Sequence, residues 1–223
     1  RGRGSSAAPA RGAGCPVAAT SRDGLTHIRA PGLDLSFDPN RARLARTQSS
    51  LTVVCGQPKG KDAVPLEPDT IAARLIRGGA EPLDSWLGGH FSIVHINLHN
   101  FRALFITDRF AVFPICYAIE GDRIAFGDRA DAVPVPNRQI DPQSIYHYVY
   151  FHVVPAPRTI FRDVWRMQAA TQLQFDAAGF RASRWWRPVF DTDAGFRRRD
   201  AAQELRRLLR SSVAAAMRSG NVG

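Results

Sequence analysis

The stretch of sequence that decides the fold covers residues 87–133 and reads LGGHFSIVHINLHNFRALFITDRFAVFPICYAIEGDRIAFGDRADAV. It contains several short runs, rich in Ile, Val, Phe and Tyr, in which apolar and polar residues alternate, a pattern typical of β-strands. Turn residues at 97–100 and 121–122 separate these runs. Because turns this short join neighbouring antiparallel strands, we predict an antiparallel meander over residues 90–127.

Strand patterns continue on both sides of this stretch. Residues 25–37 alternate loosely, as in a short hairpin, and residues 165–186 predict a second hairpin around a turn at 176–179. The β-branched run over residues 50–56 ends in Gly56, which indicates a buried strand that enters a tight turn.

Helical spacing of apolar residues appears in three places. Asp69 is suited to cap the amino terminus of a helix that two glycines end, and an Asp-Pro pair at 141–142 is suited to start a second helix. Residues 200–218 place their apolar side chains on one face, as in an amphipathic helix. Antiparallel strands with a few helices on their outer faces predict a layered α+β fold.

Composition excludes several classes of protein. No apolar run among the 223 residues approaches the roughly 18 that cross a membrane, so we expect a cytoplasmic protein without a membrane partner. Cys15, Cys55 and Cys116 have no CxxC spacing, which argues against a disulfide framework and against a metal site. The net charge of +10 comes almost entirely from scattered Arg, densest over residues 197–210, and we expect no nucleic-acid partner.

Changes in composition also predict the domain boundaries. Residues 1–24 begin with Arg, Gly, Ala and Ser and have almost nothing to bury, so we expect a disordered leader. Residues 25–190 carry the strands and form the main domain. Residues 191–223 form the amphipathic helix, which we expect to lead into a further domain.

Four motifs make the chain resemble the asparagine synthetase family. Where that family has DRFG-x-KPLYY, this chain has DRFAVFPICY from Asp108 to Tyr117, and the family's VPGPRTIF-x-GV matches VPAPRTIFRDV over residues 154–164. The family's NG-MFAF element corresponds to GGHFSI over residues 88–93, and its terminal YW to Trp185-Trp186. The resemblance implies an amino-terminal class II glutamine amidotransferase-like domain with the Ntn-hydrolase αββα fold, a sandwich of two antiparallel sheets with outer helices.

Most residues of these motifs have structural explanations. We expect Asp108 and Arg109 to form a structural ion pair. Pro155 and Pro157 flank Ala156 in a rigid extended turn. We expect Arg158 to bind a carboxylate, such as that of Asp163, or a backbone carbonyl. In the family these segments are scaffold and do not bind glutamine.

The resemblance also implies where a glutaminase site would lie. In the family an amino-terminal Cys attacks glutamine with its α-amino group as the base, an Asn-Gly pair forms the oxyanion hole, and an Arg and an Asp hold the substrate. The Asn-Gly pair corresponds to Cys55-Gly56, so the glycine is retained and the asparagine is lost. Asp69 matches the substrate-binding Asp in spacing, although a helix cap explains it equally well.

Cys15 is the sole candidate nucleophile, and its context departs from the family's pattern. Pro16 follows it, and the stretch between Cys15 and Cys55 is shorter than the family's. The HRGPD-type segment that carries the substrate-binding Arg is absent, although Arg41, Arg43 and Arg46 lie nearby. We therefore predict a degenerate glutaminase site. Cys116 lies inside a predicted strand and is expected to be a small core residue.

The implied activity belongs to an ATP-dependent ligase that forms amides. In the family a helix like that of residues 200–218 leads to an SGG-x-DSS loop that binds the pyrophosphate of ATP, and the sequence stops before such a loop. The resemblance implies no cofactor in this chain, with ATP and Mg²⁺ bound by a ligase domain of the same or a separate chain. β-Lactam synthetases and lasso peptide cyclases lack a working cysteine and keep the first domain as a scaffold. The resemblance therefore implies glutamine as the substrate of an active glutaminase, or a peptide as the substrate of a cyclase-like relative.

Three alternatives stay open at this point. In the first, the chain is an active glutaminase domain that supplies ammonia to a glutamine-hydrolysing asparagine synthase in asparagine biosynthesis. Its nucleophile is then Cys15, exposed by trimming of the chain. In the second, the chain is a non-catalytic interaction module that binds through its basic final helix or an exposed sheet edge. In the third, it is an α+β domain with a structural role alone.

Overall fold

The computed structural model describes residues 18–190 and 197–218, apart from 23, 31 and 78–81. The chain divides into two compact units, one up to Arg187 and one from Pro188 onward.

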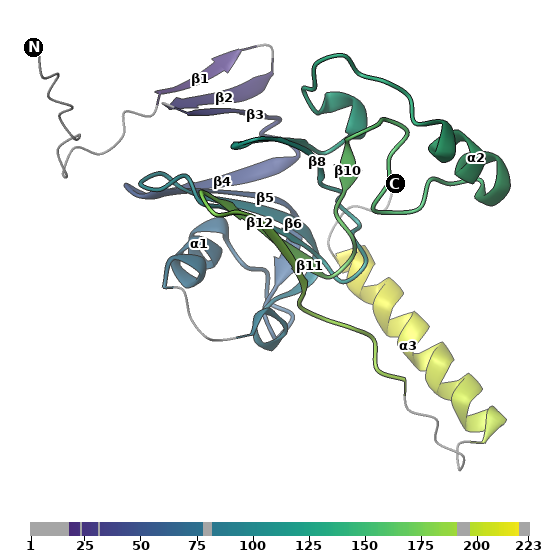
Figure 1. Cartoon of the computed structure of the whole chain (residues 1–223). Helices are drawn as coiled ribbons and strands as arrows, with labels where there is room; N and C mark the ends of the chain where they lie inside the picture. Colours follow the sequence, from purple (N-terminus) through teal and green to yellow (C-terminus); the bar gives the residue numbers. More distant parts are fainter. Residues whose placement is uncertain (1–17, 23, 31, 78–81, 191–196, 219–223) are drawn as a thin grey trace, which may run out of the picture. The chain divides into compact units, whose positions relative to one another are not determined.

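A six-stranded antiparallel sheet forms the centre of the first unit (Figure 1). Alternate side chains of its strands face opposite sides, and apolar side chains are buried on both: Val54 packs towards one layer and Val53 towards the other. In spatial order the strands are β12 (Gly179–Arg184), β11 (Thr171–Asp176), β7 (Ala103–Thr107), β6 (Gly88–Asn97), β5 (Ser50–Lys59) and β4 (Ala42–Arg46).

A second antiparallel layer packs on one face of this sheet and is split into two three-stranded sheets. Between the layers, the rings of Phe105 and Phe126 meet edge to face at 5.0 Å. The first sheet has the order β1 (Ala18–Arg22), β2 (Leu25–Ala30) and β3 (Leu33–Phe37). The second has the order β10 (Trp165–Arg166), β8 (Cys116–Glu120) and β9 (Arg123–Gly127).

Helix α1 (Pro68–Ile76) covers the outer face of the six-stranded sheet, whereas most side chains of helix α2 (Pro142–Phe151) are exposed. Helix α1 and the 3₁₀ turn η1 (Leu83–Ser85) pack on the six-stranded sheet, where Ile71 joins Phe91 and Ile93 in one buried cluster (Figure 1). The 3₁₀ turn η2 (Ala130–Ala132) and helix α2 follow β9. Helix α3 (Arg198–Arg218) belongs to the second unit. Two stacked antiparallel layers, with helix α1 on the outer face of one of them, confirm the predicted α+β fold.

Several local predictions are confirmed. The hairpins at β2–β3 and β11–β12, the turns at 97–100 and 121–122, and the amphipathic helix near the end all occur. The carboxylate of Asp141 caps α2 by accepting a hydrogen bond from the backbone N–H of Gln143. Cys116 is buried in β8 and packs with Val133 and Val164.

Three local predictions are wrong. The meander breaks after β7, because β7 pairs with β11 and β8 crosses to the other layer. Strand β1 lies within the segment expected to be disordered, because residues 18–22 pair with β2. Asp69 is not the cap of α1, since the helix begins at Pro68 with Glu67 at its N-cap position, and Asp69 lies in the first turn.

The aspartate of the DRF motif has a structural role, but without the ion pair expected for it. The fully buried Asp108 accepts hydrogen bonds from the backbone N–H groups of Phe91, Phe110 and Val112 at 2.7–3.1 Å. The guanidinium of Arg109 instead lies 5.1 Å from the ring centre of Trp186. The ion-pair prediction fails because three backbone donors already surround the carboxylate.

The second motif also differs from expectation in one partner. The Ala156-Pro157 peptide is cis, and the N–H of Arg158 bonds the carbonyl of Pro155, so the segment forms a tight turn. Arg158 forms an ion pair at 2.8 Å with Asp141 and not with Asp163. Because Asp141 also caps α2, Arg158 ties this turn to the start of the helix.

Candidate functional site

Cys55 and Gly56 lie near the end of β5, and the space over Gly56 is filled. Gly56 has a φ of +83°, which a residue with a side chain adopts at a cost. A Cβ atom added here overlaps the carbonyl oxygen of His90 and lies 2.5 Å from a ring carbon of Phe113. Glycine is therefore required at this position for both conformation and packing.

The thiol of Cys55 faces the space between the two layers and is held as a neutral group. Cys55 packs with Val53 at the interlayer core and is half-buried. Burial raises the pKa of the Cys55 thiol, which the hydrogen bond to Ser92 and the charge of Arg41 only partly counteract. Because the thiolate is the reactive form, this environment disfavours Cys55 as a nucleophile.

Two of the arginines near Cys55 already have acidic partners. Arg41 forms an ion pair at 3.0 Å with Asp128, which follows β9. Arg43 forms one at 3.1 Å with Glu67, at the start of α1. These partners cannot be predicted from the sequence, because each lies more than 20 positions from its arginine.

The start of α1 lies beside β5, which brings Asp69 to the same end of the strand as Gly56. The N–H of Leu66 bonds the carbonyl of Pro58, so the intervening turn returns the chain to β5. Asp69 is exposed, and among the described residues no hydrogen bond or ion pair engages its carboxylate. Its position in the first turn is favourable for a negative charge because of the helix dipole.

The predicted nucleophile Cys15 lies outside the described residues, so its placement stays a prediction. Among the described residues, no cluster of His, Cys, Asp and Glu is suited to hold a metal ion. Within the same part of the chain, none of the helices combines the length and apolar character needed to cross a membrane.

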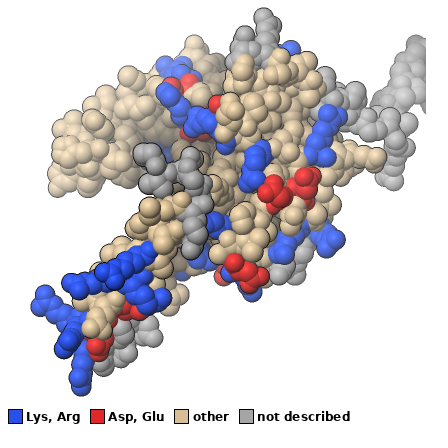
Figure 2. Space-filling model, turned by 180° about the vertical axis from the view of Figure 1, so that it is seen from behind, with Lys and Arg blue, Asp and Glu red and all other residues tan. Residues whose placement is uncertain are grey.

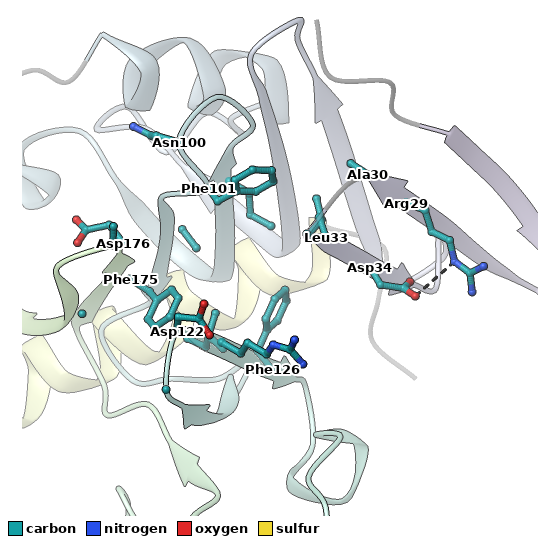
Figure 3. Close-up of a pocket in the computed structure, with 18 residues that line it drawn as sticks. Arg29, Ala30, Leu33, Asp34, Asn100, Phe101, Asp122, Phe126, Phe175 and Asp176 are labelled. Carbon is teal, nitrogen blue, oxygen red and sulfur yellow. Dashed lines mark ion pairs between the residues drawn. The ribbon is translucent and has the colours of Figure 1, made fainter. Parts of the chain in front are cut away.

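A cavity of about 1220 Å³ lies at the other end of the sandwich (Figure 3). Its wall includes Ile96 of β6. The next residue, Asn97, pairs with Ser50 at the start of β5, so the cavity lies near that end of β5. Gly56 is six positions further along β5, about 20 Å away. This cavity cannot be predicted from the sequence, because its walls come from several hairpins that meet only in the folded chain.

Helix α3 has a charged face and an apolar face. Figure 2 shows basic side chains, all of them Arg, gathered over this helix, where Arg207 pairs with Glu204. Leu205, Leu209 and Val213 follow helical spacing, and more than half of each side chain is exposed. The predicted amphipathic pattern is therefore confirmed.

Comparison with known proteins places these features in context. A family model described as a glutamine amidotransferase domain matches residues 68–186. Among solved structures, the chain is similar to the allosteric regulatory enzyme of purine biosynthesis, with 12% identity and a TM-score of 0.37, over 66% of this chain and 31% of that one. It is also similar to glutamine phosphoribosylpyrophosphate amidotransferase from B. subtilis complexed with ADP and GMP, with 11% identity and a TM-score of 0.37, over 66% and 32% of the two chains.

The matching region is thus about a third of the length of those two enzymes. A search among curated proteins finds no match. The family match begins at the start of α1 and ends at the tryptophan pair after β12.

Proposed function

The chain belongs to the glutamine amidotransferase domain family, and from this premise we propose that it is the amidotransferase-like part of an asparagine synthetase-type ligase with a degenerate glutaminase site. Such a ligase activates a carboxylate with ATP and Mg²⁺ on a ligase domain, in the same or a separate chain, and joins it to an amine. The domain described here then acts as a scaffold, as in lasso peptide cyclases and β-lactam synthetases. We place this activity in the cytoplasm.

One observation supports the proposal: the thiol of Cys55, which the resemblance to the asparagine synthetase family aligns with the oxyanion-hole asparagine, packs in the interlayer core. An oxyanion hole needs preorganised donors about 2.7–3.1 Å from the developing charge. A thiol is a weak donor, and that of Cys55 is directed between the layers beside Ser92. Phe113 packs over the α-carbon of Gly56, which gives the retained glycine a packing role.

The arginine partners support the same conclusion. A glutaminase uses an arginine to bind the substrate's carboxylate. Arg41 and Arg43 are engaged by Asp128 and Glu67, so a glutamine carboxylate has to compete with an ion pair at either position. The scaffold itself is retained, since the carboxylate of Asp108 still binds three backbone N–H groups.

One observation favours the rival function, an active glutaminase. Asp69 is exposed, and its carboxylate has no hydrogen-bond partner among the described residues, so it is available to bind the amine of glutamine. This rival also requires Cys15 to become the first residue of the chain.

A glutamate-release assay separates the two functions. L-Glutamine is incubated with the chain as given, with a form trimmed to begin at Cys15, and with the trimmed Cys15→Ser variant. We expect equal, background release from all three. Release by the trimmed form that Cys15→Ser abolishes would establish the glutaminase and remove the degenerate-site proposal.

The ligase part of the proposal needs its own test. The gene is read beyond Gly223, and the full-length protein is assayed for ATP–pyrophosphate exchange with Mg²⁺. We expect an SGG-x-DSS loop and carboxylate-dependent exchange. A downstream sequence without that loop, together with no exchange, would exclude an asparagine synthetase-type ligase on this chain.

A further inference from the structure

Helix α2 carries apolar and aromatic side chains on its outer face, at the periphery of the first unit and away from α1 (Figure 1). Helical spacing places Ile145, Tyr146, Val149 and Tyr150 on this face, and they are 47–70% exposed. Ser144, on the opposite face, is the buried residue of the helix. A surface helix normally turns polar side chains outward, so an apolar outer face is typical of a helix that another surface covers.

Polar contacts at the first turn hold α2 to the rest of the first unit. The carboxylate of Asp141 accepts hydrogen bonds from the N–H of Gln143 at 3.1 Å and from the hydroxyl of Ser144 at 2.9 Å. It also pairs with Arg158 at 2.8 Å. None of the apolar side chains of α2 belongs to a buried cluster of the described residues. Because a helix of ten residues is marginal in water by itself, apolar packing of its outer face would add stability that these contacts do not supply.

The exposed apolar surface around α2 is large enough for a stable interface. Within residues 140–153, eight large apolar side chains are about half exposed or more. An aromatic side chain covers about 150–250 Å² and an aliphatic one somewhat less, so together they expose roughly 800 Å². This equals the share of one partner in an interface of standard size, and the largest patch on a typical monomer is about 300–600 Å². Two copies that cover only two-thirds of this surface bury about 1,000 Å² in total, which is the lower limit for a stable interface.

The absence of charge on α2 favours a second copy of this chain as the partner. Residues 142–151 include no Lys, Arg, Asp or Glu, whereas the whole chain has a net charge of +10. Two copies that meet through an Arg-bearing surface bring like charges together, which costs stability. At α2 two identical faces meet without that cost. A two-fold axis places the same patch on both partners, as in most homo-oligomers.

Two other occupants match this surface less well. The residues of this chain outside the described ranges include three large apolar side chains, those of Val17, Phe196 and Val222. Three are too few to cover the eight around α2. A helix that lies on a membrane surface normally carries Lys and Arg beside its apolar face, and α2 has neither.

We propose that two copies of this chain associate through α2, with the outer faces of the two helices packed against each other about a two-fold axis. Residues four apart form ridges on a helix, here Ile145 with Val149 and Tyr146 with Tyr150, and the groove between them accepts a ridge of the partner helix. The rings of Tyr146 and Tyr150 already stack, with centres 6.2 Å apart and 15° between their planes, so one ridge is preformed. This inference goes beyond the proposed ligase function and does not depend on it.

The test measures self-association by sedimentation equilibrium of the chain as given, from about 1 to about 200 μM. We expect a reversible equilibrium between monomer and dimer. Val149→Asp places a charge on the outer face of both helices and should raise the dissociation constant of the dimer at least about 30-fold. Val64→Asp makes the same change at an exposed valine between β5 and α1, and should alter that constant less than about twofold. Because both valines are exposed, both variants should unfold within about 2 °C of the parent.

A mixture of oppositely charged variants shows whether α2 meets α2. Val149→Asp and Val149→Lys should each associate weakly, and their equimolar mixture should associate at least about tenfold more tightly than either variant alone. A parent chain that stays monomeric at about 200 μM would refute the proposal, and binding of that monomer to phosphatidylcholine vesicles would assign the face to a lipid surface. Equal weakening by Val64→Asp and Val149→Asp would refute it as well. So would a mixture that associates no more tightly than the single variants, because α2 then contacts a different surface of the second copy.

Discussion

Replacing Gly56 by Ala tests whether this position is held by packing. Two costs combine in this variant. A positive φ costs a non-glycine residue about 1–2 kcal/mol. The added Cβ overlaps the carbonyl oxygen of His90 and lies 2.5 and 2.8 Å from ring carbons of Phe113, and overpacking of this kind costs about 1–3 kcal/mol. We expect Gly56→Ala to lower the free energy of unfolding by about 2–5 kcal/mol, measured by urea denaturation.

Gly179→Ala is the matched control for the backbone cost. Gly179 has a φ of +105°, and a Cβ added there meets no atom within 4 Å. Its variant carries the strain without the overlap, so the excess loss in Gly56→Ala measures the overlap. Phe113→Ala should recover about 1 kcal/mol of that excess in a double-mutant cycle. Equal losses in the two glycine variants would refute the packing argument and would leave the surface of Gly56 open to a ligand.

Two further predictions concern buried polar groups. Asp108→Asn should lower the free energy of unfolding by at least about 2 kcal/mol in urea denaturation. The carboxylate of Asp108 accepts hydrogen bonds from three backbone N–H groups, and in the variant an amide NH₂, itself a donor, faces such a group. A loss similar to that of the exposed Asp62→Asn would contradict this. Burial lowers the pKa of His95 below its ordinary 6.5, so the unfolded chain binds a proton more readily than the folded chain. The fold therefore becomes less stable as the pH falls below about 6.5, because protonation of His95 favours the unfolded chain. His95→Gln should flatten the dependence of unfolding free energy on pH in that range; an unchanged slope would show that other groups cause it.

Predictions that depend on neighbours in sequence succeeded. Asp141 caps α2 because a helix cap acts on the next two or three residues, which a sequence displays directly. The turn at 121–122 is visible for the same reason. Asp69 shows the limit of such reasoning. It was predicted to be the N-cap of α1, but Glu67 followed by Pro68 is also suited to start a helix, and the helix begins there, two residues earlier.

Predictions that depend on distant partners failed or could not be made. Arg158 forms an ion pair with Asp141 and not with Asp163, which is closer in the sequence, because the turn at residues 155–158 lies beside the start of α2 in the folded chain. Asp108 was expected to bind its neighbour Arg109. Its carboxylate instead accepts hydrogen bonds from the backbone N–H groups of Phe91 in β6 and of Phe110 in the turn after β7. Neither outcome follows from spacing along the chain.

The sequence by itself determined the α+β class, most of the strands and the presence of a glutamine amidotransferase-like domain, since motif order and alternation of apolar residues are local properties. Its resemblance to the asparagine synthetase family also predicts that Cys55 replaces an asparagine beside Gly56. Only the tertiary structure decided that Phe113 fills the space over Gly56, that acidic residues engage Arg41 and Arg43, and that the second layer is divided between β3 and β9. These features depend on which distant segments come into contact, and a contact of that kind is set by packing of the whole chain.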